Sequence, residues 1–186
     1  MKRIIAFCLI GVIILVGVVG TTLFFTVAYP LRFKNEINEA ATRFNLPPEL
    51  IASIIRAESS FRPNAIGPRG EIGLMQLMPS TAAWLASSKM DTPGLEKQLN
   101  VPRVNITFGS FYIRYLLDKF DGDVRTALIA YNAGPAKAQR WLDESEYSRH
   151  MEQREGKRVL ISSPYPSTNH YVARILRAQR HYRWRL

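Results

Sequence analysis

Residues 47–61 read PPELIASIIRAESSF, and this stretch decides the fold of the chain. Proline suits the first turn of a helix, where its missing N–H costs nothing, so the two prolines predict that a helix begins here. Apolar residues then recur every three or four positions, which places them on one face of that helix. The last member of this row is Glu58. The pattern therefore predicts a core helix that ends in a carboxyl group.

Glu58 is a candidate general acid because of its place on this helix. A carboxyl group at the end of a buried face resists ionisation, since a low dielectric disfavours the charged form. Enzymes use such a raised pKa to keep a carboxylic acid protonated near neutral pH. The alternative interpretation is that Glu58 marks the point where the helix reaches water.

A loop rich in helix breakers follows. Residues 67–73 contain three glycines and one proline, a composition that indicates special backbone angles. Residues 74–78, LMQLM, then place one amide, Gln76, inside an apolar run. A buried amide needs partners for its donors and its acceptor, and a polar ligand can supply them. A carboxyl group and an amide on either side of a tight loop predict the wall of a cleft.

Three segments resemble the signatures of the soluble lytic transglycosylase family, whose relatives include the goose-type lysozymes. The segments are residues 51–61, IASIIRAESSF; residues 73–82, GLMQLMPSTA; and residues 130–135, AYNAGP. The resemblance extends over about residues 35–182. It implies a lysozyme-like helical domain that cleaves peptidoglycan.

The resemblance implies that one carboxyl group performs both proton transfers. Glu58 would protonate the oxygen between N-acetylmuramic acid and N-acetylglucosamine, and the 2-acetamido group would stabilise the positive anomeric carbon. The deprotonated Glu58 would then activate the sugar's own 6-hydroxyl, which closes a 1,6-anhydro ring without water. Glycosidases ordinarily need two carboxyl groups, and the sequence offers Glu58 no obvious second one, since Glu71 lies in the loop. The resemblance also assigns four residues to the sugar-binding sites: Met75, Gln76, Tyr131 and Asn132.

Tyr131 and Asn132 each have a structural alternative. Helix periodicity places Tyr131 on the inward side of its helix, so it can simply be a core tyrosine. An inward hydroxyl still needs a partner, and the family fold would offer it a sugar or Glu58. Asn132 stands just before Gly134 and can simply end the helix. The residues themselves leave both interpretations open.

Two positions depart from the family pattern. The family commonly has a serine before the loop glycines, as in Ala-x-Ser, where this chain has Gly67. Later, Ser167 replaces the glutamate of the family's Pro-aromatic-x-Glu-Thr-x-x-Tyr-Val segment. If residue 167 lies near the cleft, the missing carboxylate removes a like charge from Glu58. Neither departure touches Glu58 itself.

The composition suits one domain with an anionic partner. Lys and Arg number 25 against 15 Asp and Glu, which gives a formal net charge of +10. Such a surplus fits an anionic polymer or a membrane surface, and the chain carries no nucleic-acid-binding signature. The single Cys8 excludes an intramolecular disulfide, and the three histidines lack metal-site spacing. We expect peptidoglycan strands as the partner, no nucleic acid, no metal and no cofactor; the sequence names no protein partner.

An uncharged run over residues 4–29 follows Lys2 and Arg3. Twenty or more such residues, at about 1.5 Å each, cross a hydrocarbon core of roughly 30 Å, whereas the apolar region of a signal peptide is shorter. We therefore expect an uncleaved signal anchor over residues 1–31 and a catalytic domain over residues 32–186. Lys2 and Arg3 favour a cytoplasmic N-terminus. This orientation predicts a single-pass protein of the cell membrane with its domain on the extracytoplasmic side.

The rest of the chain is helical in pattern, and no segment alternates polar and apolar residues as a strand would. The predicted class is all-α: a lysozyme-like helical domain behind a single N-terminal transmembrane helix. Expected helices cover residues 34–45, 47–58, 79–85, 105–120, 124–132, 137–142 and 171–182, and a polar surface excursion covers residues 143–163.

Three functions stay open at this point. The favoured one is a membrane-anchored peptidoglycan lytic transglycosylase. A hydrolytic muramidase on the same fold is the second, because a fold alone does not fix the reaction. A non-catalytic wall-binding scaffold is the third. Glu58 argues against the scaffold, while Gly67 and Ser167 argue weakly for it.

Overall fold

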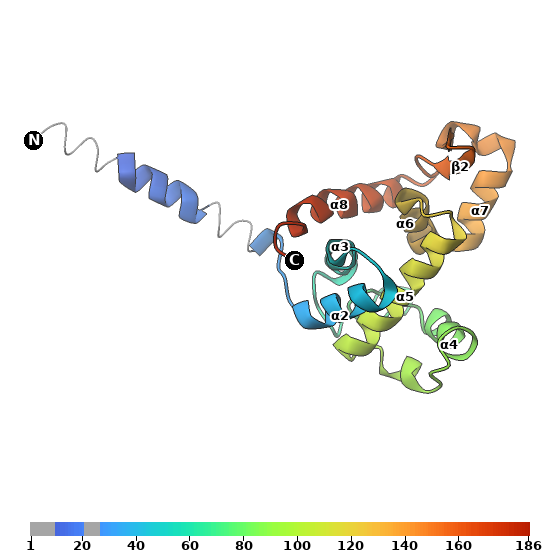
Figure 1. Ribbon diagram of the computed structural model, residues 1–186, viewed down its shortest axis with the longest axis horizontal. Coiled ribbons are helices and arrows are strands. Elements are labelled where there is room, and N and C mark those ends of the chain that lie inside the picture. The colour runs from blue at the N-terminus through green and yellow to red at the C-terminus, as the bar shows by residue number, and fades with distance from the viewer. Residues whose placement is uncertain (1–9, 21–26) are drawn as a thin grey trace, which may run out of the picture.

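The computed structural model describes residues 10–20 and 27–186. A helical domain follows a separate helical segment at residues 10–20 (Figure 1). In chain order, the elements of the domain are α2 (Lys34–Phe44), α3 (Pro48–Ser59), α4 (Pro79–Ser88), the 3-10 helix η1 (Leu95–Gln98), α5 (Pro102–Lys119), α6 (Val124–Ala133), α7 (Pro135–Asp143), the 3-10 helix η2 (Ser145–His150), strands β1 (Met151–Arg154) and β2 (Lys157–Leu160), and α8 (Pro166–Tyr182).

Proline begins five of these helices: α3, α4, α5, α7 and α8. Its fixed φ is already helical, and the first turn needs no N–H from it. The predicted start of α3 is confirmed. The predicted starts of α5, α7 and α8 were a few residues late, because each of those helices also begins at its proline.

α3 is the central helix of the domain. Its apolar row, Ile51, Ile54 and Ile55, is fully buried. In Figure 1, α3 lies in the middle of the domain, and it packs against α8 and α2. Full burial of each such side chain contributes roughly 1.5–3 kcal/mol to folding. The position of Glu58 at the end of α3 is therefore set by the core itself.

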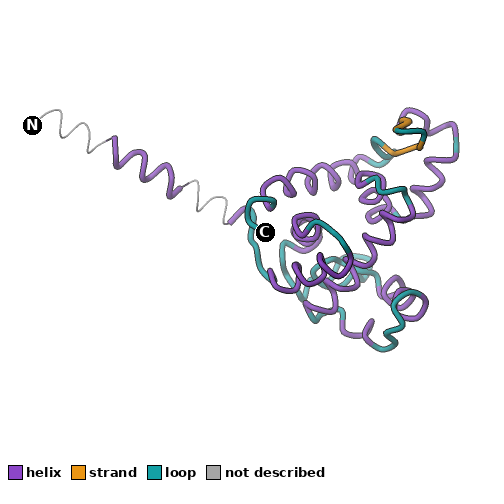
Figure 2. Tube along the Cα trace, viewed as in Figure 1, coloured by secondary structure: helices purple, strands orange, loops and turns teal. Residues whose placement is uncertain are grey.

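The segment predicted as a surface excursion, residues 143–163, contains a short antiparallel hairpin (Figure 2). Among the residues that the structure describes, β1 and β2 form the one strand pair, so the all-α prediction needs this correction. The strands have four residues each, and β2 buries Val159 and Leu160, which are neighbours in sequence. A strand that buries consecutive residues shows no alternation, which explains why the pattern missed it.

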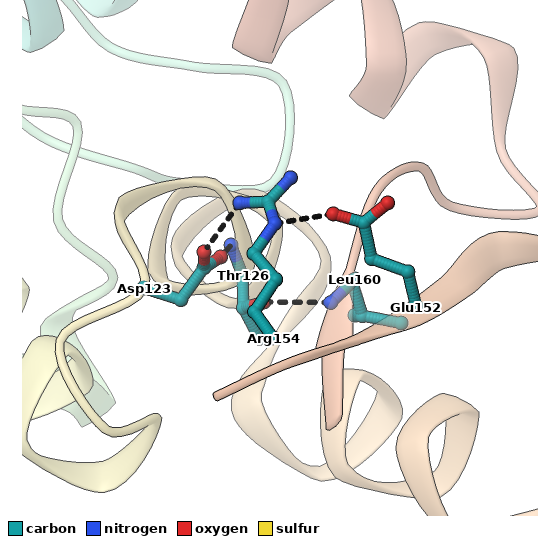
Figure 3. Close-up of polar contacts among 5 residues, drawn as sticks. All are labelled: Asp123, Thr126, Glu152, Arg154 and Leu160. Atoms are coloured by element: carbon teal, nitrogen blue, oxygen red, sulfur yellow. Dashed lines mark hydrogen bonds and ion pairs between the residues drawn. The ribbon is translucent and has the colours of Figure 1, made fainter. Parts of the chain in front are cut away.

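Polar contacts fix the hairpin to the start of α6 (Figure 3). The backbone N–H of Leu160 donates to Oγ1 of Thr126 at 2.8 Å. Asp123 caps α6 by accepting the backbone N–H of Thr126 at 2.7 Å, and its other oxygen lies 3.3 Å from Nη1 of Arg154. Arg154 also pairs with Glu152. Asp123 therefore has a structural role as a helix cap.

The segment at residues 28–30 is attached to the C-terminal end of α8. The hydroxyl of Tyr182 donates to the carbonyl of Pro30 at 2.8 Å, and Nη1 of Arg185 donates to the carbonyl of Tyr29 at 2.6 Å. Nε of Arg56, on α3, donates to the carbonyl of Ala28 at 2.8 Å. Residues 28–30 are thus held by the domain.

The predicted anchor, residues 1–31, lies partly outside the described residues, which omit residues 1–9 and 21–26. The described part has apolar side chains that are exposed all around the helix at residues 10–20. No helix in the described ranges combines the length and the apolar character needed to cross a membrane.

Candidate active site

Glu58 lies in the last turn of α3, where the buried face of the helix ends. Burial raises the pKa of Glu58 to about 7, although a hydrogen bond from Tyr171 and the charge of Arg174 oppose it. The neighbouring Glu71 adds a smaller effect that raises the pKa, and Arg69 one that lowers it. A substantial fraction of Glu58 therefore carries a proton at neutral pH, as a general acid requires.

Tyr171, in the first half of α8, is the direct partner of Glu58. Its hydroxyl donates to Oε1 of Glu58 at 2.6 Å. Burial raises the pKa of Tyr171 well above its usual value, and the nearby Glu58 charge raises it further, so Tyr171 stays protonated. Within the described chain, Oε2 of Glu58 has no hydrogen-bond partner. One oxygen of the carboxyl group is therefore oriented and the other is available to a ligand.

Asn105, on α5, holds the loop between α3 and α4. Its side chain is fully buried, and Oδ1 accepts the backbone N–H of Met75 at 2.7 Å. Nδ2 donates to the carbonyls of Ile72 at 2.9 Å and Leu99 at 2.8 Å. Gly73, with φ of 83°, passes so close that a Cβ there would lie 2.3 Å from Nδ2. Only glycine suits this position.

Gln76 is held in the left-handed region, with φ of 47°. Its Nε2 donates to the carbonyls of Ala65 at 3.1 Å and Gly73 at 2.9 Å. The two donors of the amide are thus engaged by the loop, while Gln76 still lines the cavity beside Glu58. Its oxygen is the atom that a ligand can address.

Tyr131 bridges α6 to the loop without touching Glu58. Its hydroxyl donates to the carbonyl of Met75 at 2.8 Å, a partner that differs from both alternatives considered from the sequence, a sugar and Glu58. Burial raises the pKa of Tyr131 well above its usual value, and so does the charge of Glu58. The side chain of Met75 is fully buried and packs against Gly109 on α5. Tyr131 lines the cavity, whereas the side chain of Met75 does not.

Asn132 also lines the cavity, and α8 orients it. The hydroxyl of Thr168 donates to Oδ1 of Asn132 at 2.8 Å. Thr168 is buried, whereas its neighbour Ser167 is exposed and is not among the residues that line the cavity. The first turns of α8 therefore orient two cavity residues, Asn132 through Thr168 and Glu58 through Tyr171.

The loop carboxylate Glu71, which was not an obvious second carboxyl group from the sequence, lines the same cavity as Glu58. Glu71 is buried and forms an ion pair with Arg69, whose Nη2 lies 2.7 Å from Oε1. Burial acts to raise the pKa of Glu71, but backbone N–H groups of Glu71 and Arg69 and the Arg69 side chain outweigh it and lower that pKa. The cavity thus holds one carboxyl group that is protonated near neutral pH and one that stays ionised.

The cavity has a volume of about 230 Å³. Its polar lining comes from Glu58, Arg69, Glu71, Gln76, Tyr131 and Asn132. It shares Thr81, Tyr112 and Pro135 with an adjoining hollow of about 340 Å³ that Trp84 and Tyr115 also line. Ligand sites commonly combine aromatic walls with a few polar groups. The two hollows together form an extended site of this kind.

The structure therefore brings together four of the five predicted site residues: Glu58, Gln76, Tyr131 and Asn132. Sequence reasoning missed Tyr171, Thr168, Asn105 and the ion pair of Arg69 with Glu71. The segment at residues 164–172 carried a signal for Tyr171, since it resembles a family motif that ends in Tyr-Val. Among the described residues, no group of three or more metal-ligating side chains has a geometry suited to a metal ion.

Comparisons with known proteins identify the family of this chain. The family model described as "Transglycosylase SLT domain" matches residues 35–153. The "Soluble lytic murein transglycosylase" of Escherichia coli is 29% identical over 158 residues, which are 84% of this chain and 24% of that protein. The "Membrane-bound lytic murein transglycosylase C" of Histophilus somni is 30% identical over 167 residues, 82% of this chain and 46% of that protein. The chain spans about a quarter to a half of the length of these relatives.

Solved structures show the same likeness. An inactive mutant of a lytic transglycosylase from Pseudomonas aeruginosa superposes with a TM-score of 0.73 at 28% identity, over 87% of this chain and 25% of that one. The 70 kDa soluble lytic transglycosylase of Escherichia coli gives a TM-score of 0.70 at 28% identity over 84% of this chain and 25% of that one. A complex of the 70 kDa soluble lytic transglycosylase with bulgecin A gives 0.70 at 27% identity. The family match covers well over half of the chain. The chain therefore belongs to the transglycosylase SLT domain family.

Proposed function

We propose that this protein is a peptidoglycan lytic transglycosylase. It cleaves the β-1,4 bond between N-acetylmuramic acid and N-acetylglucosamine without water and leaves 1,6-anhydro ends. The observation that carries the proposal is the state of Glu58, a carboxyl group with a pKa of about 7 in a cavity beside an aromatic-walled hollow. Family membership and relatives named as lytic murein transglycosylases support it.

In the proposed reaction, Glu58 returns to its starting state. Its proton passes to the bridging oxygen as the bond from that oxygen to the anomeric carbon breaks, and N-acetylglucosamine leaves with the proton. The 2-acetamido group stabilises the positive anomeric carbon. The carboxylate of Glu58 then takes the proton of the 6-hydroxyl, and the oxygen of that hydroxyl bonds to the anomeric carbon. Tyr171 supports the carboxylate stage, because a hydrogen bond to the charged form stabilises it.

Four further residues are proposed to take part in sugar binding, three directly and one by holding another in place. Gln76, Tyr131 and Asn132 act through the side chains that line the cavity. Met75 contributes through its backbone, because its carbonyl holds the hydroxyl of Tyr131.

A hydrolytic muramidase is the second candidate, and Glu71 is the observation that favours it. Hydrolytic glycosidases ordinarily use two carboxyl groups, one protonated and one ionised. Glu58 and Glu71 have pKa values shifted in opposite directions within one cavity. Arg69 engages both oxygens of Glu71, however: its guanidinium bonds Oε1 and its backbone N–H donates to Oε2, which makes Glu71 a poor base for water.

The products distinguish these two reactions. The full chain in detergent is incubated with purified sacculi, and the released muropeptides are analysed by mass spectrometry. We expect products that end in anhydro-muramic acid, each lighter by one water than its hydrolytic counterpart, and a release with Glu58→Gln that is lower by about 10²–10⁴-fold. Products that have gained water would replace this proposal with the muramidase. Binding of sacculi without any release would favour a wall-binding scaffold.

We also propose that residues 1–31 anchor residues 32–186 in the cell membrane, with the domain on the extracytoplasmic side. The uncharged run and the exposed apolar helix at residues 10–20 support this anchor. Alkaline carbonate should leave the protein in the membrane fraction. A mature protein that begins near residue 29 would show a cleaved leader instead.

A further inference from the structure

Three charged side chains line the cavity within the described chain: Glu58, Glu71 and Arg69. The proposed mechanism uses Glu58 and gives the other two no part. Their exposures differ sharply, since the side chain of Arg69 is 72% exposed and that of Glu71 is 9% exposed. The carboxylate thus lies inside the wall, and the guanidinium reaches solvent at the cavity.

Glu71 fixes one side of the Arg69 guanidinium and leaves another side free. Nε and Nη2 of Arg69 each lie 2.7 Å from Oε1 of Glu71, and the backbone N–H of Arg69 donates to Oε2 at 2.9 Å. Nη1 has no partner in the part of the chain that the structure describes. A guanidinium binds a carboxylate best through two parallel N–H···O bonds. Nη1 and the second N–H of Nη2 present such a pair.

Gly67 makes this arrangement possible. A Cβ at residue 67 would lie 2.5 Å from Oε2 of Glu71 and 2.7 Å from Oε1 of Gln76. Any side chain there would displace the carboxylate that orients Arg69. An ion pair with so exposed a member contributes little net stability. Stability alone therefore does not account for an ion pair built into the cavity wall.

The pair lies within electrostatic reach of the acid. The charge of Glu71 raises the pKa of Glu58 and that of Arg69 lowers it. An anion bound to Arg69 would offset the positive charge and help Glu58 to keep its proton. Occupancy of Arg69 would thus favour the form of Glu58 that begins the reaction.

We propose that Arg69, oriented by Glu71, binds a carboxylate of the peptide stem that N-acetylmuramic acid carries, and so selects stem-bearing glycan strands. This inference rests on the proposed peptidoglycan substrate. Arg69 is the cation among the residues that line the cavity. Without it, the two carboxyl groups would repel an acidic stem. In this assignment Arg69 contacts the substrate and Glu71 is a positioning residue.

A binding experiment in the full chain carrying Glu58→Gln tests this, because no cleavage is needed. Fluorescently labelled glycan strands are prepared with their stems and, by amidase treatment, without them. Adding Arg69→Gln should lower the affinity for stem-bearing strands at least about tenfold, since charge-assisted hydrogen bonds are strong. The affinity for stripped strands should change by less than about twofold.

Matched variants separate charge from geometry. Arg177→Gln removes an exposed arginine of α8 outside the cavity and should change neither affinity. Arg69→Lys keeps the charge but lacks the planar fork, so it should recover only part of the preference for stems. Glu71→Gln should reduce the same preference, because the guanidinium loses its fixed direction.

Two outcomes would overturn the inference. An equal loss with both kinds of strand would mean that the ion pair only shapes the loop. An unchanged affinity for stem-bearing strands would show that Arg69 is only a solvated side chain and does not bind the stem. The product analysis is separate from this binding test. If wild-type products gain water, the proposed reaction fails while the stem preference can still stand or fall on its own.

Discussion

Tyr171 and Tyr182 lie on the same helix, α8, about three turns apart. Both are buried, and each donates its hydroxyl to a distant part of the chain: Tyr171 to Glu58 at 2.6 Å, and Tyr182 to the carbonyl of Pro30 at 2.8 Å. A carbonyl does not titrate, so the bond of Tyr182 only holds two segments together. A carboxyl group does titrate, so the hydrogen bond from Tyr171 also lowers the pKa of Glu58, against the effect of burial. The acceptor therefore determines whether a tyrosine has a structural or an electrostatic effect.

Replacing Glu58, the acceptor of the Tyr171 hydroxyl, should have the largest effect. Glu58→Gln keeps the shape and removes the transferable proton. General acid–base groups typically contribute about 10²–10⁴-fold, so release of anhydro-muropeptides should fall by that factor. The rate of release from sacculi measures this, with circular dichroism as the control for folding. Release near the wild-type rate would assign the proton transfers to another residue.

The same variant should remove a pH dependence of stability. Glu58 has a folded-state pKa of about 7, above its ordinary 4.5, so its stabilising contribution is complete below pH 4.5 and is lost as pH rises through 7. The pKa difference of about 2.5 corresponds to about 3 kcal/mol. Glu58→Gln should therefore gain about 3 kcal/mol relative to wild type between pH 4 and pH 8. Urea denaturation at a series of pH values measures the difference, and a constant difference would contradict the raised pKa.

Tyr171→Phe removes the donor but keeps the ring. The hydrogen bond from Tyr171 lowers the pKa of Glu58, so its loss should raise that pKa further. The alkaline limb of the pH–rate profile, which reports loss of the catalytic proton, should move to higher pH. Release should also slow by roughly tenfold or more, because the carboxylate formed in the reaction loses a charge-assisted bond. An alkaline limb that stays in place or moves to lower pH would contradict the role given to Tyr171.

Tyr182→Phe is the matched change at the other end of α8 and should have the smallest effect. It leaves the carbonyl of Pro30 without its donor, which should cost about 1 kcal/mol of unfolding free energy. The pH–rate profile should keep its shape, since Tyr182 bonds no titrating group. A shifted alkaline limb in this variant would show that the two ends of α8 are coupled.

The central part of the fold was predictable because its signals are local. The prolines at residues 47–48 and the apolar row that follows specify α3 and the place of Glu58 on it. The same proline rule applied to Pro102, Pro135 and Pro166 would have corrected three helix starts. The hairpin was missed because its stability comes from Thr126 and a buried Leu160, contacts that are distant in sequence.

The candidate site was predictable only where the type of a residue indicates whether its side chain faces the core or the cavity. Met75 stands beside Gln76 in an apolar run, but the run turns at Gln76, so one side chain faces the core and the other the cavity. Asn105 gave no signal, because a buried asparagine in an apolar helix is recognised only from the carbonyls that it meets. Glu71 reaches the cavity because Gly67 has no side chain to displace it. That close approach depends on the folded loop and cannot be predicted from the sequence.

The length of α8 has a mechanical consequence. The span from Tyr171 to Tyr182 is about 17 Å of continuous helix, with the hydrogen bond to Glu58 at one end and the hydrogen bond to Pro30 at the other. If residues 1–31 are a tether, this helix sets how far beyond the tether point Glu58 can reach. A pull on the tether would reach residues 28–30, which are held by Arg56 on α3 and by Tyr182 and Arg185 at the end of α8. Such a pull would load both α3, which carries Glu58, and α8, which carries its hydrogen-bond donor Tyr171.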